Sequence, residues 1–291
     1  LLSDTPQINT FGGSGQGGSN SDFSGGFAPA IHSIGGGSSS ATLVLINGHR
    51  FPTQGLTEAQ ADPTAIPASA LQRVEILPDV WLDARRAVWL SRPRLLVVAD
   101  LHWGYAASHR AEGNLLPIWG DDEIAARLRA LLADYRPAGM LWLGDSLHTL
   151  AGRAAAEAFL QAKEVETIVL SGNHDRRWKH ATAATAERDG FFFHHGDADP
   201  GPIVPASTLE LLGHHHPAAT WSDGAGSYLK LPALVASSRR LILPAFSPWA
   251  GGTPWNRQLQ PGETLWAIGA KRIFALAGTP AKKKEEGGRK N

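Results

Sequence analysis

The sequence predicts an α/β fold with a parallel sheet, followed by a second sheet that is mixed or antiparallel. Between residues 94 and 170, apolar runs that read as buried strands alternate with helical segments, the pattern of βαβ units. After Gly190 the strand-like runs continue without helices. Several apolar runs also end in residue types that bind metals. In parallel sheets, binding sites form at the carboxyl ends of the strands.

Composition leaves room for an enzyme and excludes several kinds of site. The chain has 291 residues, 43% of them apolar, and a formal net charge of zero, so charge alone does not indicate a nucleic-acid or membrane surface. It has no cysteine, which excludes disulfides, thiolate zinc sites and cysteine nucleophiles. No apolar run approaches the roughly 18 residues of a membrane-spanning helix and no signal peptide is visible. We therefore expect a cytoplasmic protein.

The first part of the chain has a different character from the rest. Residues 1–40 are rich in glycine and serine, and such a segment buries too little apolar surface to offset the entropy of ordering it. Strand-like runs follow at 42–47 and 72–77. Through residues 41–50 and 66–79, this part resembles the plug domain of TonB-dependent outer-membrane receptors. The many strands of a receptor barrel do not follow, so we expect a plug-like fragment over residues 1–79.

From residue 80 onward the pattern is that of a compact enzyme domain, expected to span 80–277. The segment 121–135 is an amphipathic helix, because Ile124 and Leu128 share one face and acidic residues begin it. A second helix is expected at 152–162, and residues 278–291 are expected to form a basic disordered tail. The expected strands are two short ones within 80–90, then 94–99, 139–143, 166–170, 191–194, 208–212, 227–231, 233–236, 240–243, 264–268 and 272–275.

Candidate metal ligands follow several of these strands. A two-metal hydrolytic site needs hard or borderline ligands, a bridging carboxylate and a fixed water. Asp100 and His102 are spaced so that both reach one metal, Asp145 is the natural bridge, and Asn173 offers a neutral oxygen. The second half of the chain supplies imidazoles from His195, His214 and His216.

The histidine run at 214–216 has two interpretations. If it is strand-like, His214 and His216 point the same way and each serves a different ion, while His215 points away. The other interpretation is a polar loop without a ligand role. Each motif alone fits an ordinary turn or surface, and the ordered set as a whole favours the metal site.

Further residues have candidate roles in catalysis or substrate binding. His174, beside Asn173, can stabilise developing charge or protonate the leaving oxygen, and Asp175 could orient it. Arg176 and Arg177 either contact a substrate phosphate, which suits their forked donors, or form a solvated turn. His148 either supports the site and substrate or merely begins a helix.

The ordered motifs resemble the signature of calcineurin-like metallophosphoesterases over roughly residues 80–277. They are Asp100-x-His102, Gly144-Asp145, Gly172-Asn173-His174-Asp175, His195-Gly196 and Gly213-His214-x-His216. The resemblance implies a four-layer αββα fold with two mixed sheets and two divalent metals. By position, it implies Asp100, His102, Asp145 and His216 on metal one. Metal two would be held by Asp145, Asn173, His195 and His214, with His174 as the catalytic histidine.

Within that superfamily the chain is most similar to the ligase-associated DNA damage response endonuclease branch (PdeM type). Residues 82–87, 99–104, 172–177, 213–217 and 243–246 carry this similarity. The branch implies manganese, with iron or zinc as alternatives, DNA as a candidate substrate, and ligase-associated repair proteins as candidate partners. The chain departs from the pattern at Tyr105, where a lysine is expected. His194 competes with His195 as the ligand, and we favour His195 because it precedes Gly196.

These observations predict a dimetal phosphoester hydrolase that attacks phosphorus with a metal-bridging hydroxide. A phosphodiesterase or nuclease is the first hypothesis, and a small-molecule or nucleotide phosphomonoesterase is the alternative. An envelope interaction module built on the plug-like segment is the hypothesis from another class. Metal analysis with a panel of diesters and monoesters separates these hypotheses.

Overall fold

The computed structural model describes residues 73–277, apart from 163, 181–182, 199–203, 223 and 270–271, together with four short strands before residue 51. These strands pair antiparallel in twos. The other expectations for residues 1–72, and the basic tail at 278–291, lie outside the described residues. The four strands are β1 (Ile8–Phe11), β2 (Ala28–Ile31), β3 (Leu45–Ile46) and β4 (His49–Arg50).

The chain divides into two compact units, Leu1–Ala70 and Leu71–Asn291, whereas the sequence suggested a boundary at Asp79. Strand β5 (Arg73–Leu77) explains the difference, because it pairs antiparallel with β6 (Val80–Asp83). The run that resembled the end of a plug fragment is therefore the edge strand of a sheet in the second unit.

That sheet has six strands, in the order β10-β9-β8-β7-β6-β5. Strands β8, β9 and β10 are parallel, and the remaining neighbours are antiparallel. The predicted alternation of strands and helices is confirmed, and α1 is an additional helix that the sequence did not predict. The elements are β7 (Ala87–Leu90), β8 (Leu95–Val98), α1 (Tyr105–Ala111), α2 (Gly120–Tyr135), β9 (Gly139–Trp142), the 3-10 turn η4 (Leu150–Gly152), α3 (Arg153–Gln161), β10 (Thr167–Val169) and the 3-10 turn η5 (Asp175–Arg177).

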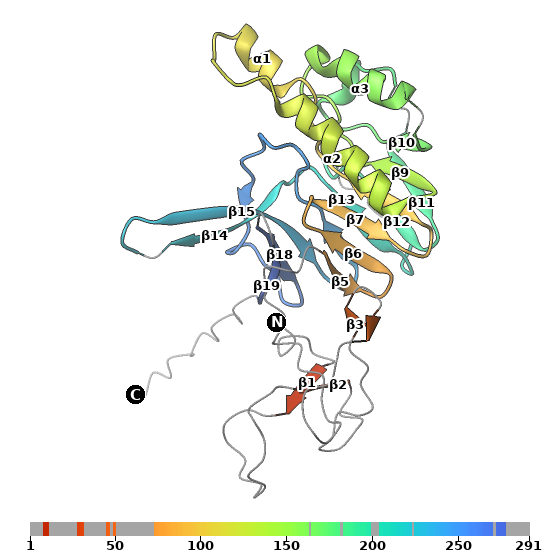
Figure 1. Cartoon of the computed structure of the whole chain (residues 1–291), viewed down its shortest axis with the longest axis vertical. Coiled ribbons are helices and arrows are strands. Elements are labelled where there is room, and N and C mark those ends of the chain that lie inside the picture. The colour runs from red at the N-terminus through yellow and green to blue at the C-terminus, as the bar shows by residue number, and fades with distance from the viewer. Residues whose placement is uncertain are drawn as a thin grey trace, which may run out of the picture. The chain divides into compact units, whose positions relative to one another are not determined.

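The central strands are buried on both faces, which explains their unbroken apolar sequence. In β8, Leu96 and Val98 face the helical layer and pack in one cluster with Ile124 and Leu128 of α2. The alternate residues of β8 belong to a second cluster that contains side chains of the other sheet, such as Phe193. The helices thus cover one face of the six-stranded sheet, as Figure 1 shows.

The second sheet has nine strands, and its order is β11-β12-β13-β16-β15-β14-β17, with β18 on β15 and β19 on β18. Its mixed character confirms the predicted fold class. Strands β11, β14 and β17 were not predicted. The strands are β11 (Thr185–Arg188), β12 (Phe191–His194), β13 (Leu209–Leu212), β14 (Pro217–Ser222), β15 (Tyr228–Ala236), β16 (Arg240–Ile242), β17 (Thr253–Pro254), β18 (Thr264–Ile268) and β19 (Ile273–Ala277).

The sequence predicted two strands where the structure has the single strand β15. Pro232 suggested the break, because proline cannot donate to a ladder. In β15, however, Pro232 pairs with Ala218 of β14, and the pairing with β18 starts one residue later. Pro232, which has no N–H, thus lies where the partner of β15 changes from β14 to β18. The strand therefore continues past the proline.

In the described part of the chain, the outer face of the nine-stranded sheet packs a third apolar cluster formed by strand residues such as Val235 and Leu265, together with loop residues such as Trp255. No helix of the described residues is long and apolar enough to cross a membrane.

Candidate metal centre

The candidate ligands come from loops that follow five strands, three in one sheet and two in the other. Asp100 follows β8, Asp145 follows β9 and Asn173 follows β10. His195 directly follows β12, and the histidine run follows β13. The parallel strands of both sheets therefore present their carboxyl ends to one place, as the fold class requires. A bridge between Ala99 and Ala245, extended by a hydrogen bond from Ser247 N to Asp100 O (3.1 Å), joins the two sheets beside the site.

The first group of candidate ligands consists of Asp100, His102 and His216. His216 Nε2 lies 3.3 Å from Asp100 Oδ1 and 3.3 Å from His102 Nε2. Asp100 and His102 are buried. Burial lowers the pKa of His102 to about 4, against the raising effect of Asp100. The imidazole is therefore neutral at pH 7, which is the form that binds a metal.

The second group consists of Asp145, His195 and His214, with Asn173 beside them. His195 Nε2 lies 3.3 Å from Asp145 Oδ1, 3.3 Å from Asn173 Oδ1 and 3.2 Å from His214 Nδ1. Burial opposes the charge on His195, but its hydrogen bond to Asp145 and the charge of Asp100 outweigh it and raise the pKa of His195 to about 9. The same contact outweighs the burial of Asp145 and lowers its pKa to about 2.

The spacing of these atoms fits two divalent metal ions. Metal–nitrogen bonds of about 2.1 Å with angles of about 100° put neighbouring ligand atoms roughly 3.2 Å apart. Each group shows separations of this size between atoms that carry lone pairs once the imidazoles are neutral, the form that binds a metal. Carboxylate, amide oxygen and imidazole are borderline to hard donors, which suit manganese, iron or zinc.

Five of the candidate ligands have a left-handed backbone, which non-glycine residues rarely adopt. They are Asp100 (φ 54°), His102 (φ 49°), Asp145 (φ 45°), His214 (φ 65°) and His216 (φ 45°). Such a conformation costs roughly 1–2 kcal/mol per residue. Strain of this kind clusters at functional sites, and no sequence pattern indicated it.

The left-handed turns also correct the interpretation of the 214–216 run, which is not strand-like. It lies in the loop between β13 and β14, and the turns at His214 and His216 bring both rings to the site. His215 packs instead against Trp255, with ring centroids 5.7 Å apart. The structure places His214 and His216 in different candidate groups and His215 in neither, but the strand geometry that was expected to do this is absent.

His174 lies at the accessible side of the site, with 35% of its side chain exposed. Its Nδ1 lies 2.9 Å from the backbone oxygen of His148, and because a carbonyl only accepts, Nδ1–H donates. Nε2 then faces Asp145, 3.9 Å from Oδ2. The His148 ring stacks on the His174 ring at 5.2 Å. His148 therefore supports His174, through both its carbonyl and its ring.

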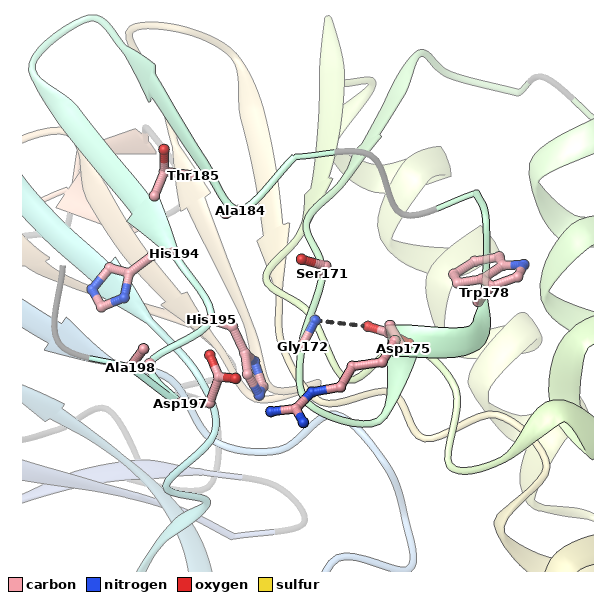
Figure 2. A pocket seen from close by; sticks show the side chains of 12 residues that line it. Ser171, Gly172, Asp175, Trp178, Ala184, Thr185, His194, His195, Asp197 and Ala198 are labelled. Carbon is pink, nitrogen blue, oxygen red and sulfur yellow. Dashed lines mark hydrogen bonds between the residues drawn. The ribbon is translucent and has the colours of Figure 1, made fainter.

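Asp175 has a different part from the one expected, because the hydrogen bond that positions His174 comes from His148. The Asp175 carboxylate is buried and accepts hydrogen bonds from the backbone N–H groups of Ser146 (3.1 Å), Leu147 (2.9 Å) and Gly172 (3.1 Å, Figure 2). It thus ties the turn that carries Asp145 to the turn that carries Asn173.

The structure gives the remaining candidate residues different surroundings. His194 is turned away from the second group and pairs with Glu210 (2.7 Å). Arg176 lines a cavity of about 490 Å³ beside His195, and Arg177 does not. Tyr105 packs its ring on His148 at 4.5 Å.

Two supporting residues were not predicted from the sequence, namely Arg86 and Arg127. Arg86 donates to the backbone oxygens of Ala245 (3.3 Å) and Ser247 (2.7 Å), and Arg127 donates to Phe246 (2.8 Å). They hold the loop that bonds to Asp100. In the sequence, Arg86 and this loop both fall in segments that carried the family resemblance. Arg127 does not.

Residues 93–236 match the family model of the calcineurin-like phosphoesterases. The chain carries a calcineurin-like phosphoesterase domain. The family is dimetal-dependent, which agrees with the two ligand groups. Among curated proteins, none matches the chain.

Solved structures resemble this calcineurin-like phosphoesterase domain to different degrees. The nuclease MPE of Pseudomonas putida has 27% sequence identity and a TM-score of 0.54, covering 70% of this chain and 99% of that one. Yfce, a phosphoesterase from E. coli, has 16% identity and a TM-score of 0.36, covering 64% of this chain and 99% of that one.

Proposed function

We propose that the protein is a phosphodiesterase that works with two divalent metal ions, with manganese as the expected metal. The observation that carries this proposal is that the two ligand groups and Asn173, which follow five strand ends, contact one another. Metal one would be held by Asp100, His102, Asp145 and His216. Metal two would be held by Asp145, Asn173, His195 and His214.

When bound, two such ions would neutralise the charge of a phosphoester and lower the pKa of a bound water molecule. The residues of the chain then have separate tasks. Asp145 contacts His195 and faces His174, which suits a carboxylate shared between both ions. Asp100 accepts the backbone N–H of His214 (2.9 Å) and so holds the two groups together.

His174 is proposed as the acid that completes hydrolysis. Because its Nδ1–H is committed to His148, its Nε2 is the nitrogen available to substrate. Water adds to phosphorus and releases one proton to solvent, the ester P–O bond breaks, and the imidazolium form of His174, which carries a proton on both ring nitrogens, protonates the departing alkoxide from Nε2. The products are a phosphomonoester and an alcohol, and His174 regains its proton from solvent.

A diester is preferred over a monoester as substrate because the related Pseudomonas putida structure is that of a nuclease. The same likeness supports a nucleic acid, with DNA as the candidate. Repair proteins as partners remain a proposal that comes from the sequence resemblance, and a cytoplasmic location remains a proposal that comes from the composition of the chain.

The test uses purified, manganese-loaded protein with bis(4-nitrophenyl) phosphate and 4-nitrophenyl phosphate. We expect faster hydrolysis of the diester, about two bound ions per chain, and loss of activity in His174→Ala. Preference for the monoester would favour the phosphomonoesterase alternative. A folded, metal-loaded protein that cleaves neither ester would refute the proposed function.

The envelope-module hypothesis has its own test, the removal of residues 1–70. The cut keeps β5, which belongs to the six-stranded sheet. We expect unchanged diesterase activity, since no described ligand lies in that segment. Loss of activity in a soluble, folded truncation would restore a role for the N-terminal part.

A further inference from the structure

We propose that the cavity beside the second ligand group is a subsite for a second phosphate of the substrate, selected by Arg176. This inference rests on the proposed phosphodiesterase function and narrows its substrate. It favours substrates in which another phosphate follows the scissile one, such as a nucleotide chain, over isolated diesters.

The position of the cavity connects it to the reaction. Gly172 and His195 form part of its lining, and His195 contacts Asp145 and His214 of the second group. His174, in contrast, lies against His102 of the first group, with ring centroids 5.1 Å apart. A bound diester would therefore place its leaving oxygen near His174 and extend its retained side into the cavity.

The charges around the cavity leave Arg176 available for an anion. Among the described residues, its exposed side chain forms no hydrogen bond or ion pair. Asp175 is occupied by three backbone N–H groups, and His194 is paired with Glu210. Asp197 is the one exposed carboxylate of the described lining, and it makes no ion pair with Arg176. A guanidinium fork matches a phosphate well.

The size and lining of the cavity suit a nucleotide unit. Its volume of about 490 Å³ falls within the range of small-molecule sites. Ser171 and Thr185 line it with hydroxyl groups, and Figure 2 shows both among the residues around the cavity. Hydroxyls that donate to sugar or phosphate oxygens would add to the contact from Arg176.

Arg177 provides a matched control. It is the adjacent residue in η5, is exposed like Arg176 and forms no ion pair among the described residues, but it does not line the cavity. Removing either side chain changes the net charge by the same amount. A local subsite predicts different effects for the two substitutions, whereas a general electrostatic attraction predicts equal effects.

The experiment compares two probes, the 4-nitrophenyl ester of thymidine 5′-phosphate and the same ester with a second phosphate on the 3′ oxygen. We expect the wild-type protein to prefer the bisphosphate probe. Arg176→Ala should lower kcat/KM for that probe about tenfold, through KM, the scale of one lost charged hydrogen bond. It should leave the single-phosphate probe within about twofold. Arg176→Lys should lie between, and Asp197→Asn should strengthen the preference by removing a like charge.

The outcomes separate the two proposals. If the wild-type protein cleaves both probes equally, or if Arg176→Ala and Arg177→Ala behave alike, the subsite is wrong while the phosphodiesterase stands. If neither probe nor bis(4-nitrophenyl) phosphate is cleaved, the proposed function itself fails. Titration of thymidine 3′,5′-bisphosphate into the metal-loaded proteins gives a second readout. Weaker binding in Arg176→Ala alone supports the subsite, and equal binding in all variants overturns it.

Discussion

The two halves of the metal centre differ in how they are held. On the side of the six-stranded sheet, the turns that carry the ligands bond to each other: His102 N to Asp145 O (3.0 Å), Asp100 N to Gly144 O (3.2 Å), and three N–H groups to Asp175. On the side of the nine-stranded sheet, one such bond joins the turns, from Gly213 N to His195 O (3.0 Å).

The histidines of the nine-stranded side are instead positioned by the other half. His195 Nδ1–H donates to Leu143 O (2.8 Å), and His214 N–H donates to Asp100. The six-stranded half is therefore a self-supporting frame, and the nine-stranded half adds imidazoles to it. Changes in the frame should affect both ligand groups, whereas changes in a histidine should remain local.

The largest effect is expected at Asp145, the frame carboxylate that contacts His195 and that is proposed to be shared by both ions. Asp145→Ala should lower kcat/KM for a diester about 1,000-fold, since ligand loss removes several kcal/mol of transition-state stabilisation. It should also reduce the number of bound ions, measured by elemental analysis. Asp122→Ala, on the exposed face of α2, is the control. Retention of both ions and more than about a tenth of the activity would contradict the central role of Asp145.

A smaller effect on activity, but a clear one on stability, is expected at Asp175. Asp175→Ala leaves three buried N–H groups without their acceptor, which should cost about 3 kcal/mol or more in free energy of unfolding. Urea denaturation with a chelator present measures this without the contribution of bound metal. Asp175→Asn keeps one acceptor oxygen, so its free energy of unfolding should lie between those of the wild-type protein and Asp175→Ala. Equal stability of all three proteins would show that Asp175 does not join the turns.

The smallest effect is expected within the histidine run. His214→Ala should weaken metal binding by at least about 10-fold, the smallest effect typical of losing a residue that only supports a ligand, while the unfolding free energy without metal stays near that of the wild-type protein. His215→Ala, whose ring packs on Trp255, should bind metal as the wild-type protein does. If both variants lose metal equally, the local character of this half is refuted.

Much of the fold and the candidate ligands could be predicted from the sequence for a physical reason. Buried parallel strands have unbroken apolar sequences, so their ends are easy to locate, and metal-binding residue types directly after them stand out. Asp100, Asp145 and His195 were found in this way, and the structure brings them together.

The features that were not predicted from the sequence depend on contacts between distant segments or on backbone conformation. The pairing that places β5 in the six-stranded sheet, the passage of β15 through Pro232 and the backbone partners of Asp175 are all tertiary features. The left-handed turn at His214 has no local signal, because such turns usually use glycine or asparagine.

The glycines beside the ligands limit how this centre can vary. A Cβ on Gly172 would collide with Asp145, and a Cβ on Gly213 would lie 2.7 Å from Asp100 Oδ2. Each glycine thus leaves room for a carboxylate supplied by another loop. Substitutions that add atoms cannot adjust the interior of the site without displacing a ligand. New substrate preferences are therefore expected to arise by change at the rim, where exposed side chains such as Arg176 can be exchanged while the interior stays constant.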